Sequence, residues 1–156
     1  MSNIVTCEHR ESRFDSEILE LIPHREPMLL INQLLSVSAN SSEALVIVDQ
    51  QTPFYQPEIG GVPAWIGLEY MGQTSALIAG HQRREGQIDP HLGFLMGVRK
   101  YQTSVSYFDQ SDNLIVLCEE AALVGDSLAT FNCTIRTQKN SQELATAMLS
   151  VFRRPV

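Results

Sequence analysis

Cysteine is scarce in this chain of 156 residues, which has three copies at Cys7, Cys118 and Cys133. They form neither a CxxC pair nor a cluster with the spacing of metal ligands, which argues against a zinc site or a dithiol redox motif. An odd number of cysteines without a pairing pattern is typical of a reducing compartment, so we expect a cytoplasmic protein. Cys118 and Cys133 fall in strand-like apolar runs, where a thiol acts as a small hydrophobic group.

Long apolar runs and an excess of positive charge are also missing. No uninterrupted apolar run reaches the roughly 18 residues that a membrane span requires, and the polar, charged first residues are unlike a secretion signal. The formal net charge of -7 disfavours nonspecific binding to nucleic acid. No metal, nucleotide or flavin motif occurs, so we expect no cofactor and neither nucleic acid nor membrane as a partner.

The chain shows no repeats and no shift in composition. We expect residues 1–13 to form a loose arm and residues 14–156 to form one domain of common size. Periodicity and turn-forming residues predict a helix over 14–22 with Asp15 or Ser16 as its N-cap, strands over 28–38 and 43–50, a long helix over 63–81, and strands over 93–105, 113–123, 127–138 and 143–153.

The predicted helix over 63–81 is apolar on nearly every side. A helix without a polar face is usually buried on all sides. One long helix against an antiparallel sheet of about six strands is a two-layer α+β architecture. The sheet would curl around the helix, which is the hotdog arrangement.

One acid, Glu69, lies in the middle of this apolar helix. A carboxylate there is costly to desolvate unless it is paired, protonated or used in chemistry. Gln73 follows four residues later on the same helix face. Two interpretations stay open from these residues alone: a functional acid, or a structural acid tied to a buried arginine or a backbone amide.

Three segments resemble the β-hydroxyacyl-acyl-carrier-protein dehydratases of fatty-acid synthesis: LIPHREPMLLI (21–31), TPFYQPEIGGVPAWIGLEYMGQ (52–73) and GFLMGVRKYQ (93–102). The similarity extends over residues 16–153. The GVPAWIGLEYM segment is closer to the aryl-polyene-type (ApeP-like) subgroup of these dehydratases. The resemblance implies a hotdog fold. It also implies an enzyme that removes water from 3-hydroxyacyl chains carried on acyl carrier protein.

The chain departs from this family at the position of its catalytic histidine. The family carries that histidine in an HFPG motif before the long helix, whereas the corresponding loop here reads YQPEIGGVP and has none. His24 of the PHR segment is our preferred general base, because imidazole titrates near neutral pH. His9, His81, His91 and Glu58 are weaker candidates.

The reaction also needs an acid for the leaving hydroxyl and donors for the thioester oxygen. By resemblance, Glu69 is the acid, and burial favours the protonated form that it needs. The backbone amides of Ala64 and Trp65 at the helix N-terminus suit the oxyanion. Gln73 would orient Glu69, and Arg25 would pair with Glu69 or with the phosphopantetheine arm.

An acyl carrier protein is acidic, so it would have to meet local basic groups on this acidic chain. Arg25, Arg99-Lys100 and Arg153-Arg154 are the candidate patches. A lone hotdog protomer leaves a sheet edge uncovered, so we expect a homodimer or a heterodimer with another hotdog subunit.

Two alternatives to a dehydratase stay open. The missing HFPG histidine is compatible with a non-catalytic partner subunit of an active dehydratase. A hotdog acyl thioesterase, with Glu69 activating water, is the other.

Overall fold

The computed structural model describes residues 13–88, 91–125 and 127–155. Its elements follow one another as α1 (Ser16–Leu21), β1 (Gln33–Val37), β2 (Ser41–Val46), β3 (Gly61–Pro63), a 3-10 turn η1 (Ala64–Ile66), α2 (Gly67–Arg84), β4 (His91–Thr103), β5 (Tyr107–Asp109), β6 (Leu114–Val124), β7 (Leu128–Thr137) and β8 (Glu143–Pro155). No helix in the described part of the chain is both long enough and apolar enough to cross a bilayer.

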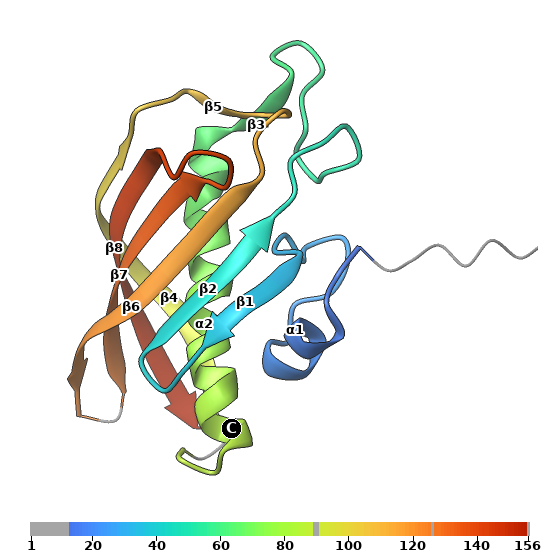
Figure 1. Cartoon of the computed structure of the whole chain (residues 1–156). Helices are drawn as coiled ribbons and strands as arrows, with labels where there is room; N and C mark the ends of the chain where they lie inside the picture. Colours follow the sequence, from blue (N-terminus) through green and yellow to red (C-terminus); the bar gives the residue numbers. More distant parts are fainter. Residues whose placement is uncertain (1–12, 89–90, 126, 156) are drawn as a thin grey trace, which may run out of the picture.

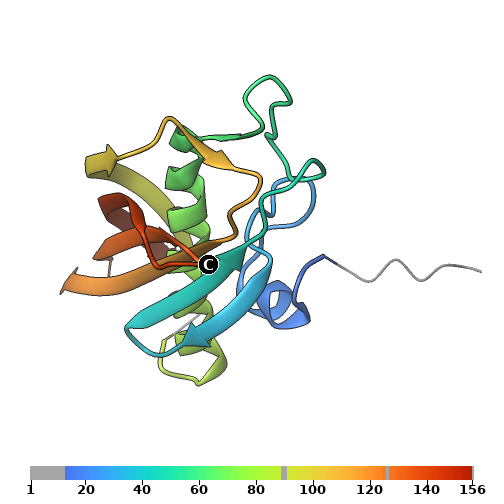
Figure 2. The same ribbon diagram turned by 45° about the horizontal axis from the view of Figure 1, so that its top comes forward.

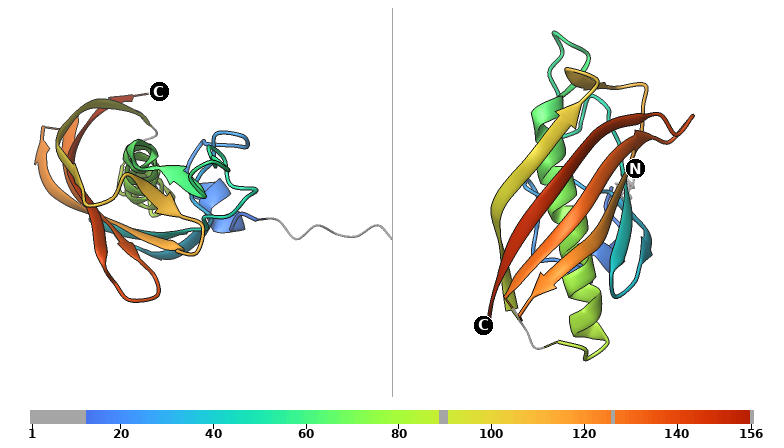
Figure 3. Two further views of the ribbon diagram at one scale, coloured as in Figure 1. Left: turned by 90° about the horizontal axis from the view of Figure 1, so that it is seen from above. Right: turned by 90° about the vertical axis from the view of Figure 1, so that its left-hand side faces the viewer.

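The main sheet has six antiparallel strands in the order β1-β2-β6-β7-β8-β4. It curls around α2, as Figure 1 shows from the side and Figure 3 from above. A second, two-stranded sheet pairs β3 with β5 near the start of α2. The predicted α+β hotdog fold is therefore confirmed.

The core lies between the concave face of the sheet and α2. Alternate side chains of β6 and β7 point inward, as the period of a half-buried strand requires. They meet Tyr70, Met71 and Ile78 of α2, which are fully buried. Cys118 and Cys133 face each other across β6 and β7 and are buried, as predicted.

Helix α1 begins where the sequence indicates. Asp15 is its N-cap and accepts a hydrogen bond from the amide of Glu17 at 3.0 Å. The second carboxylate oxygen of Asp15 accepts from the Leu34 amide at 3.2 Å, which joins α1 to β1. Helix α1 contacts α2, and Figure 2 shows α1 outside the curved sheet.

Two local expectations were wrong, and one falls partly outside the described residues. Pro63 ends β3 and precedes the 3-10 turn instead of opening α2. The predicted strand over 28–38 is confined to Gln33–Val37, because the Leu30 amide bonds to a helix side chain rather than to a neighbouring strand. Residues 1–12 of the expected arm are not described. Arg13 at its end is ion-paired with Asp49 at 3.0 Å.

The helix side chain that bonds to the Leu30 amide is Gln73, which is fully buried. Its Oε1 accepts from the Leu30 amide at 2.9 Å, and its Nε2 donates to the Met28 carbonyl at 2.8 Å. The segment before β1 is therefore bonded to α2 through one side chain. These contacts determine how the loop after α1 passes over the helix.

Replacing Gln73 with Leu should lower the free energy of unfolding by about 2–4 kcal/mol, because a buried amide and a buried carbonyl lose their partners. Urea denaturation at one protein concentration measures this loss. The control is Gln87→Leu, a change of the same type at an exposed position, which should cost less than about 0.5 kcal/mol. Equal losses in both variants would contradict the assigned role of Gln73.

Two glycines of α2 offer a matched test of helix packing. A Cβ at Gly80 would lie 2.0 Å from the Leu21 carbonyl oxygen, whereas one at Gly72 meets nothing within 4 Å. Gly80→Ala should therefore destabilise the protein by about 1–3 kcal/mol. Gly72→Ala should be neutral or stabilise it by up to about 1 kcal/mol. The measurement is the melting temperature, Tm, of each variant. A shift of Tm in the same direction for both variants would show that α1 does not pack closely on α2.

Candidate active site

A cavity of about 490 Å³ lies along one face of α2. Its three walls are α2 from Glu69 to Arg83, the segment 19–25 at the end of α1, and residues of β4, β7 and β8. The strand residues that line it are Gly93, Leu95, Phe131, Val151 and Arg153.

Small residues of α2 make room for this cavity. Gly72, Ala76 and Ala79 lie along the helix wall, where larger side chains would fill the space. Together with the apolar strand residues they give the cavity a largely hydrocarbon middle. A cavity of this size and lining suits a small molecule or an acyl chain.

Glu69 lies in the first turn of α2 and lines the cavity. Its Oε1 accepts a hydrogen bond from Gln73 Nε2 at 2.9 Å. The orientation of the Gln73 amide is determined by the backbone, because only its oxygen can accept from the Leu30 amide. Gln73 therefore presents an N–H to Glu69, which is the contact expected from the sequence.

His24 lies in the loop after α1 and lines the same cavity as Glu69. Burial lowers the pKa of its imidazole below the usual value, the negative charge of Glu69 opposes this shift, and the positive charge of Arg25 adds to it. The ring is therefore neutral at neutral pH, as a general base must be. Its Nδ1 is buried and has no hydrogen-bond partner among the described residues.

Arg25 does not pair with Glu69. Its guanidinium donates to the carbonyls of Leu19, Ile22 and His24 at 2.8, 2.9 and 2.7 Å. These carbonyls belong to the end of α1 and the residues after it, where a cation is favourable. Arg25 thus holds the loop that carries His24 and acts on the imidazole through its charge.

The expected oxyanion donors lie elsewhere. Neither Ala64 nor Trp65 belongs to the lining of the cavity. The Ala64 amide donates to the Ser106 carbonyl at 3.0 Å, so it is not available for a substrate oxygen. The Trp65 side chain is exposed and packs edge-to-face on Phe54, with ring centroids 6.4 Å apart.

The other candidate bases are not brought to Glu69 in the described part of the chain. His81, in the last turn of α2, and Glu58, on an exposed loop, do not line the cavity. His9 lies outside the described residues. His91 begins β4, but its side chain lies outside what the structure describes.

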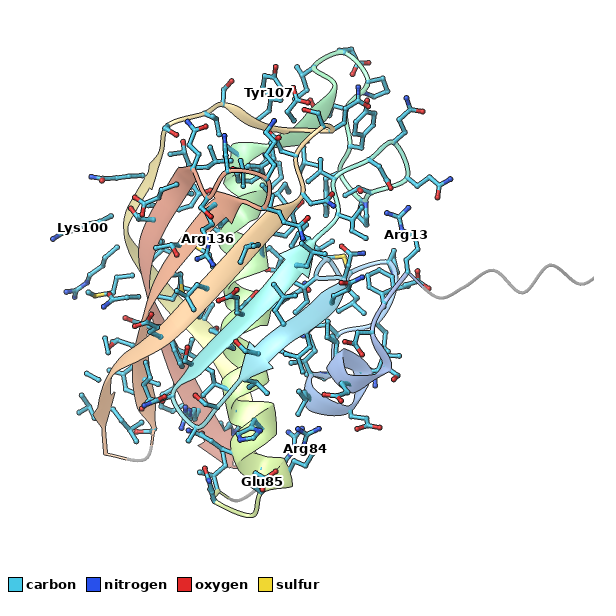
Figure 4. The ribbon with its side chains drawn as sticks, viewed as in Figure 1. Arg13, Arg84, Glu85, Lys100, Tyr107 and Arg136 are labelled. Atoms are coloured by element: carbon cyan, nitrogen blue, oxygen red, sulfur yellow. The ribbon has the colours of Figure 1, made fainter. Side chains whose placement is uncertain are left out.

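The residues of the expected basic patches differ in exposure. Arg99, Lys100 and Arg154 are exposed, and Figure 4 shows Lys100 pointing away from the sheet. Arg153 is 7% exposed and lines the cavity, so it is not a surface group. The alternation of β8 could have revealed this, because Arg153 lies on the same face as Leu149, which is fully buried.

No group of three or more His, Cys, Asp or Glu side chains within the described ranges is placed to hold a metal ion. The cavity brings together the His24 imidazole and the Glu69 carboxyl beside apolar residues, and Glu20, Arg25, Arg83 and Arg153 line it as well.

Comparison with known proteins identifies a family that this chain matches. A family model described as ApeP-like, ApeP dehydratase, matches residues 16–155. Among curated proteins, the 3-hydroxyacyl-[acyl-carrier-protein] dehydratase FabZ of Ralstonia nicotianae is 36% identical over 80 residues, which cover 46% of this chain and 49% of the relative. FabZ of Polynucleobacter necessarius is 39% identical over 67 residues, covering 40% and 45% of the two chains. The chain thus spans about half the length of the curated relatives it matches.

Solved structures agree on the fold. The dehydratase heterocomplex ApeI:P from Xenorhabdus doucetiae contains a chain that is 26% identical, with a TM-score of 0.77 over 88% of this chain and 90% of that one. A hypothetical thioesterase of Streptococcus pneumoniae, solved with coenzyme A, has a TM-score of 0.61 at 11% identity over 79% and 85% of the two chains, and shows the fold alone. The match of the family model over nearly the whole chain shows that this protein belongs to the ApeP-like dehydratase family.

Proposed function

We propose that this protein removes water from a 3-hydroxyacyl thioester carried on the phosphopantetheine arm of an acyl carrier protein, with His24 as base and Glu69 as acid. The observation that carries the proposal is that both side chains line one cavity. The charge of Glu69 acts on the pKa of His24, yet the two side chains form none of the ion pairs found among the described residues, which leaves room for a substrate between them.

Each group has one proton to move in this reaction. The His24 imidazole takes a proton from C2 of the acyl chain, and the electron pair of that C–H bond forms the new double bond. In the reactive form of the pair the proton is on Glu69, and the C3–O bond breaks as this carboxylic acid gives its proton to the leaving hydroxyl, which departs as water. The products are an enoyl thioester, an imidazolium and a carboxylate, and proton transfer between the last two restores the enzyme.

The surroundings of each group support this division of roles. Desolvation keeps His24 neutral, which is the form that accepts a proton. Gln73 engages one oxygen of Glu69 and leaves the other for the substrate hydroxyl.

Changing either group should lower kcat/KM by about 10²- to 10⁴-fold, because each supplies one proton transfer. The variants are Glu69→Gln and His24→Asn, assayed as formation of enoyl product from 3-hydroxyacyl-pantetheine and from the same acyl group on carrier protein. Glu85→Gln and His81→Asn, which change the same residue types away from the cavity, are the controls and should keep wild-type rates. Normal turnover by Glu69→Gln would refute the assignment, and equal kcat/KM on both carriers would refute a role for carrier protein.

The pH profile tests His24 separately. Its pKa lies below the usual value of about 6.5, so the neutral base persists to slightly acidic pH. In the wild type, kcat/KM should stay constant as pH falls to about 6.5 and decline only below it. The residual activity of His24→Asn should lack this acidic decline. A decline that survives in that variant would assign the base to another group.

We also propose that the protein works as a dimer, either with itself or with a second hotdog subunit. The thirteen-residue β4 is an edge of the sheet and offers unpaired backbone groups to another chain. A similar chain forms part of a dehydratase heterocomplex. Light scattering should give twice the chain mass of 17.4 kDa for the protein alone, or a mixed dimer when a second hotdog chain is coexpressed. A monomer in both preparations would exclude the dimer.

A further inference from the structure

Two arginines line the end of the cavity that is remote from Glu69. Arg83 lies in the last turn of α2 and donates to the Leu21 carbonyl at 3.3 Å. Arg153 lies on β8 opposite Gly93 of β4. The C-terminal ends of α2 and β8 lie at the same end of the molecule in Figures 1 and 3. Both arginines therefore border the part of the cavity where α2 ends.

Arg153 has a buried donor that the described residues do not use. Its side chain is 8% exposed, and its Nη2 is buried without a hydrogen-bond partner among those residues. The carboxylate of Glu120 is 3.7 Å away, which is beyond hydrogen-bonding distance. Leaving a buried donor unpaired costs free energy. A ligand that brings an acceptor to this end of the cavity is therefore favoured.

The described residues leave a positive charge at this end. Glu20 also lines the cavity, and its carboxylate lies 3.9 Å from Arg84. Glu120 lies next to Arg153, so each of these two acids has an arginine partner. Arg83 takes part in none of the ion pairs among the described residues. An acceptor that carries one negative charge would balance it.

The length of the cavity wall matches the phosphopantetheine arm. Arg83 follows Glu69 by 14 residues in α2, which corresponds to ~21 Å along the helix. About sixteen covalent bonds join the phosphorus of the arm to C3 of a 3-hydroxyacyl group. An extended chain spans ~3.3–3.6 Å for every three bonds, so this part is roughly 18–19 Å long. The long side chain of Arg83 covers the remainder, and a phosphate there places C3 beside Glu69.

The opposite orientation, with the acyl chain in the cavity, fits this end less well. It would place a hydrocarbon against two guanidiniums and leave the buried Nη2 of Arg153 unpaired. Phosphate oxygens are strong acceptors that arginine binds through paired N–H groups. This end of the cavity also reaches solvent, because Glu20 and Arg84 are exposed. An arm attached to a carrier protein outside the cavity requires such an opening.

We infer that Arg83 and Arg153 bind the phosphate of the phosphopantetheine arm, which enters at the C-terminal end of α2 and extends along the helix to His24 and Glu69. The inference rests on the proposed function in taking this arm as the carrier of the acyl group. A phosphodiester carries one negative charge, which the charge of Arg83 balances.

Binding of unreactive substrate mimics tests this inference independently of catalysis. In each probe an amide replaces the thioester. Two probes carry a 2-butenoyl group, one on pantetheine and one on pantetheine with a methyl phosphodiester. A third carries a ten-carbon 2-enoyl group on pantetheine. Titration calorimetry measures their affinity for the wild type, Arg83→Met, Arg153→Met and the control Arg154→Met, whose arginine is exposed on β8.

The wild type and Arg154→Met should bind the phosphodiester probe about tenfold or more tightly than 2-butenoyl pantetheine, the range of a hydrogen bond to a charged group. Arg83→Met and Arg153→Met should each lose most of this preference and bind the probe without phosphate as the wild type does. The double variant Arg153→Met/Glu120→Gln removes the carboxylate that the single change strands. It replaces Arg153→Met if that variant folds poorly.

An undiminished phosphate preference in Arg83→Met and Arg153→Met would overturn the inference. An affinity that rises with acyl length and ignores the phosphate would also overturn it, because the acyl chain would then fill the cavity.

Coenzyme A presents the same phosphate-ester chemistry, so the 2-butenoyl amide is also tested on coenzyme A and on acyl carrier protein. Weaker binding of the carrier-linked amide to Arg83→Met supports the arm of the carrier as the occupant. Weakening confined to the coenzyme A amide would contradict this and assign the subsite to coenzyme A. The dehydration assay distinguishes the two proposals. A phosphate preference without enoyl product would retain this inference and refute the dehydratase, and enoyl product without a phosphate preference would do the reverse.

Discussion

The geometry of the candidate site depends on one buried amide. Gln73 is enclosed in the core, and its carbonyl and two N–H groups all have partners. Two of these partners are backbone groups of Met28 and Leu30, and the third is the Glu69 carboxylate. The same side chain therefore fixes the path of the loop that carries His24 and the orientation of the acid. Because a buried polar group without partners is costly, this arrangement is the favourable one for the loop, the helix and the acid together.

The cavity follows from an incomplete enclosure of α2. The sequence predicts a helix covered on all sides, because it has no polar face. The sheet covers the side that carries Tyr70 and Ile78, which are fully buried. The opposite side, with Gly72 and Ala76, faces the cavity. An apolar helix face that borders an open cavity gains free energy when other apolar groups cover it, and the acyl substrate or the second hotdog chain proposed above would do so.

The regular elements were predictable because their periodicity is strong, whereas single contacts were not. Asp15 caps α1 and Gln73 bonds to Glu69 as expected, since both depend on short sequence spacings. The three-residue strands β3 and β5 are too short to give a periodic signal. The placement of Arg25 on carbonyls, and the bond from the Ala64 amide to a distant carbonyl, depend on tertiary structure. Glu69 was identified as the one acid in the middle of an apolar helix, and the family motif suggested its role, but no motif indicates what lies opposite it in the cavity.

The two ends of the cavity differ in how they tolerate charge. At one end, burial lowers the pKa of His24 and favours its neutral form, while the charge of Glu69 opposes this shift. At the other end, Arg153 stays buried with Glu120 at 3.7 Å. Replacing a buried ion pair by apolar side chains is often neutral or stabilising, so stability alone gives no reason to keep a loosely bonded guanidinium there.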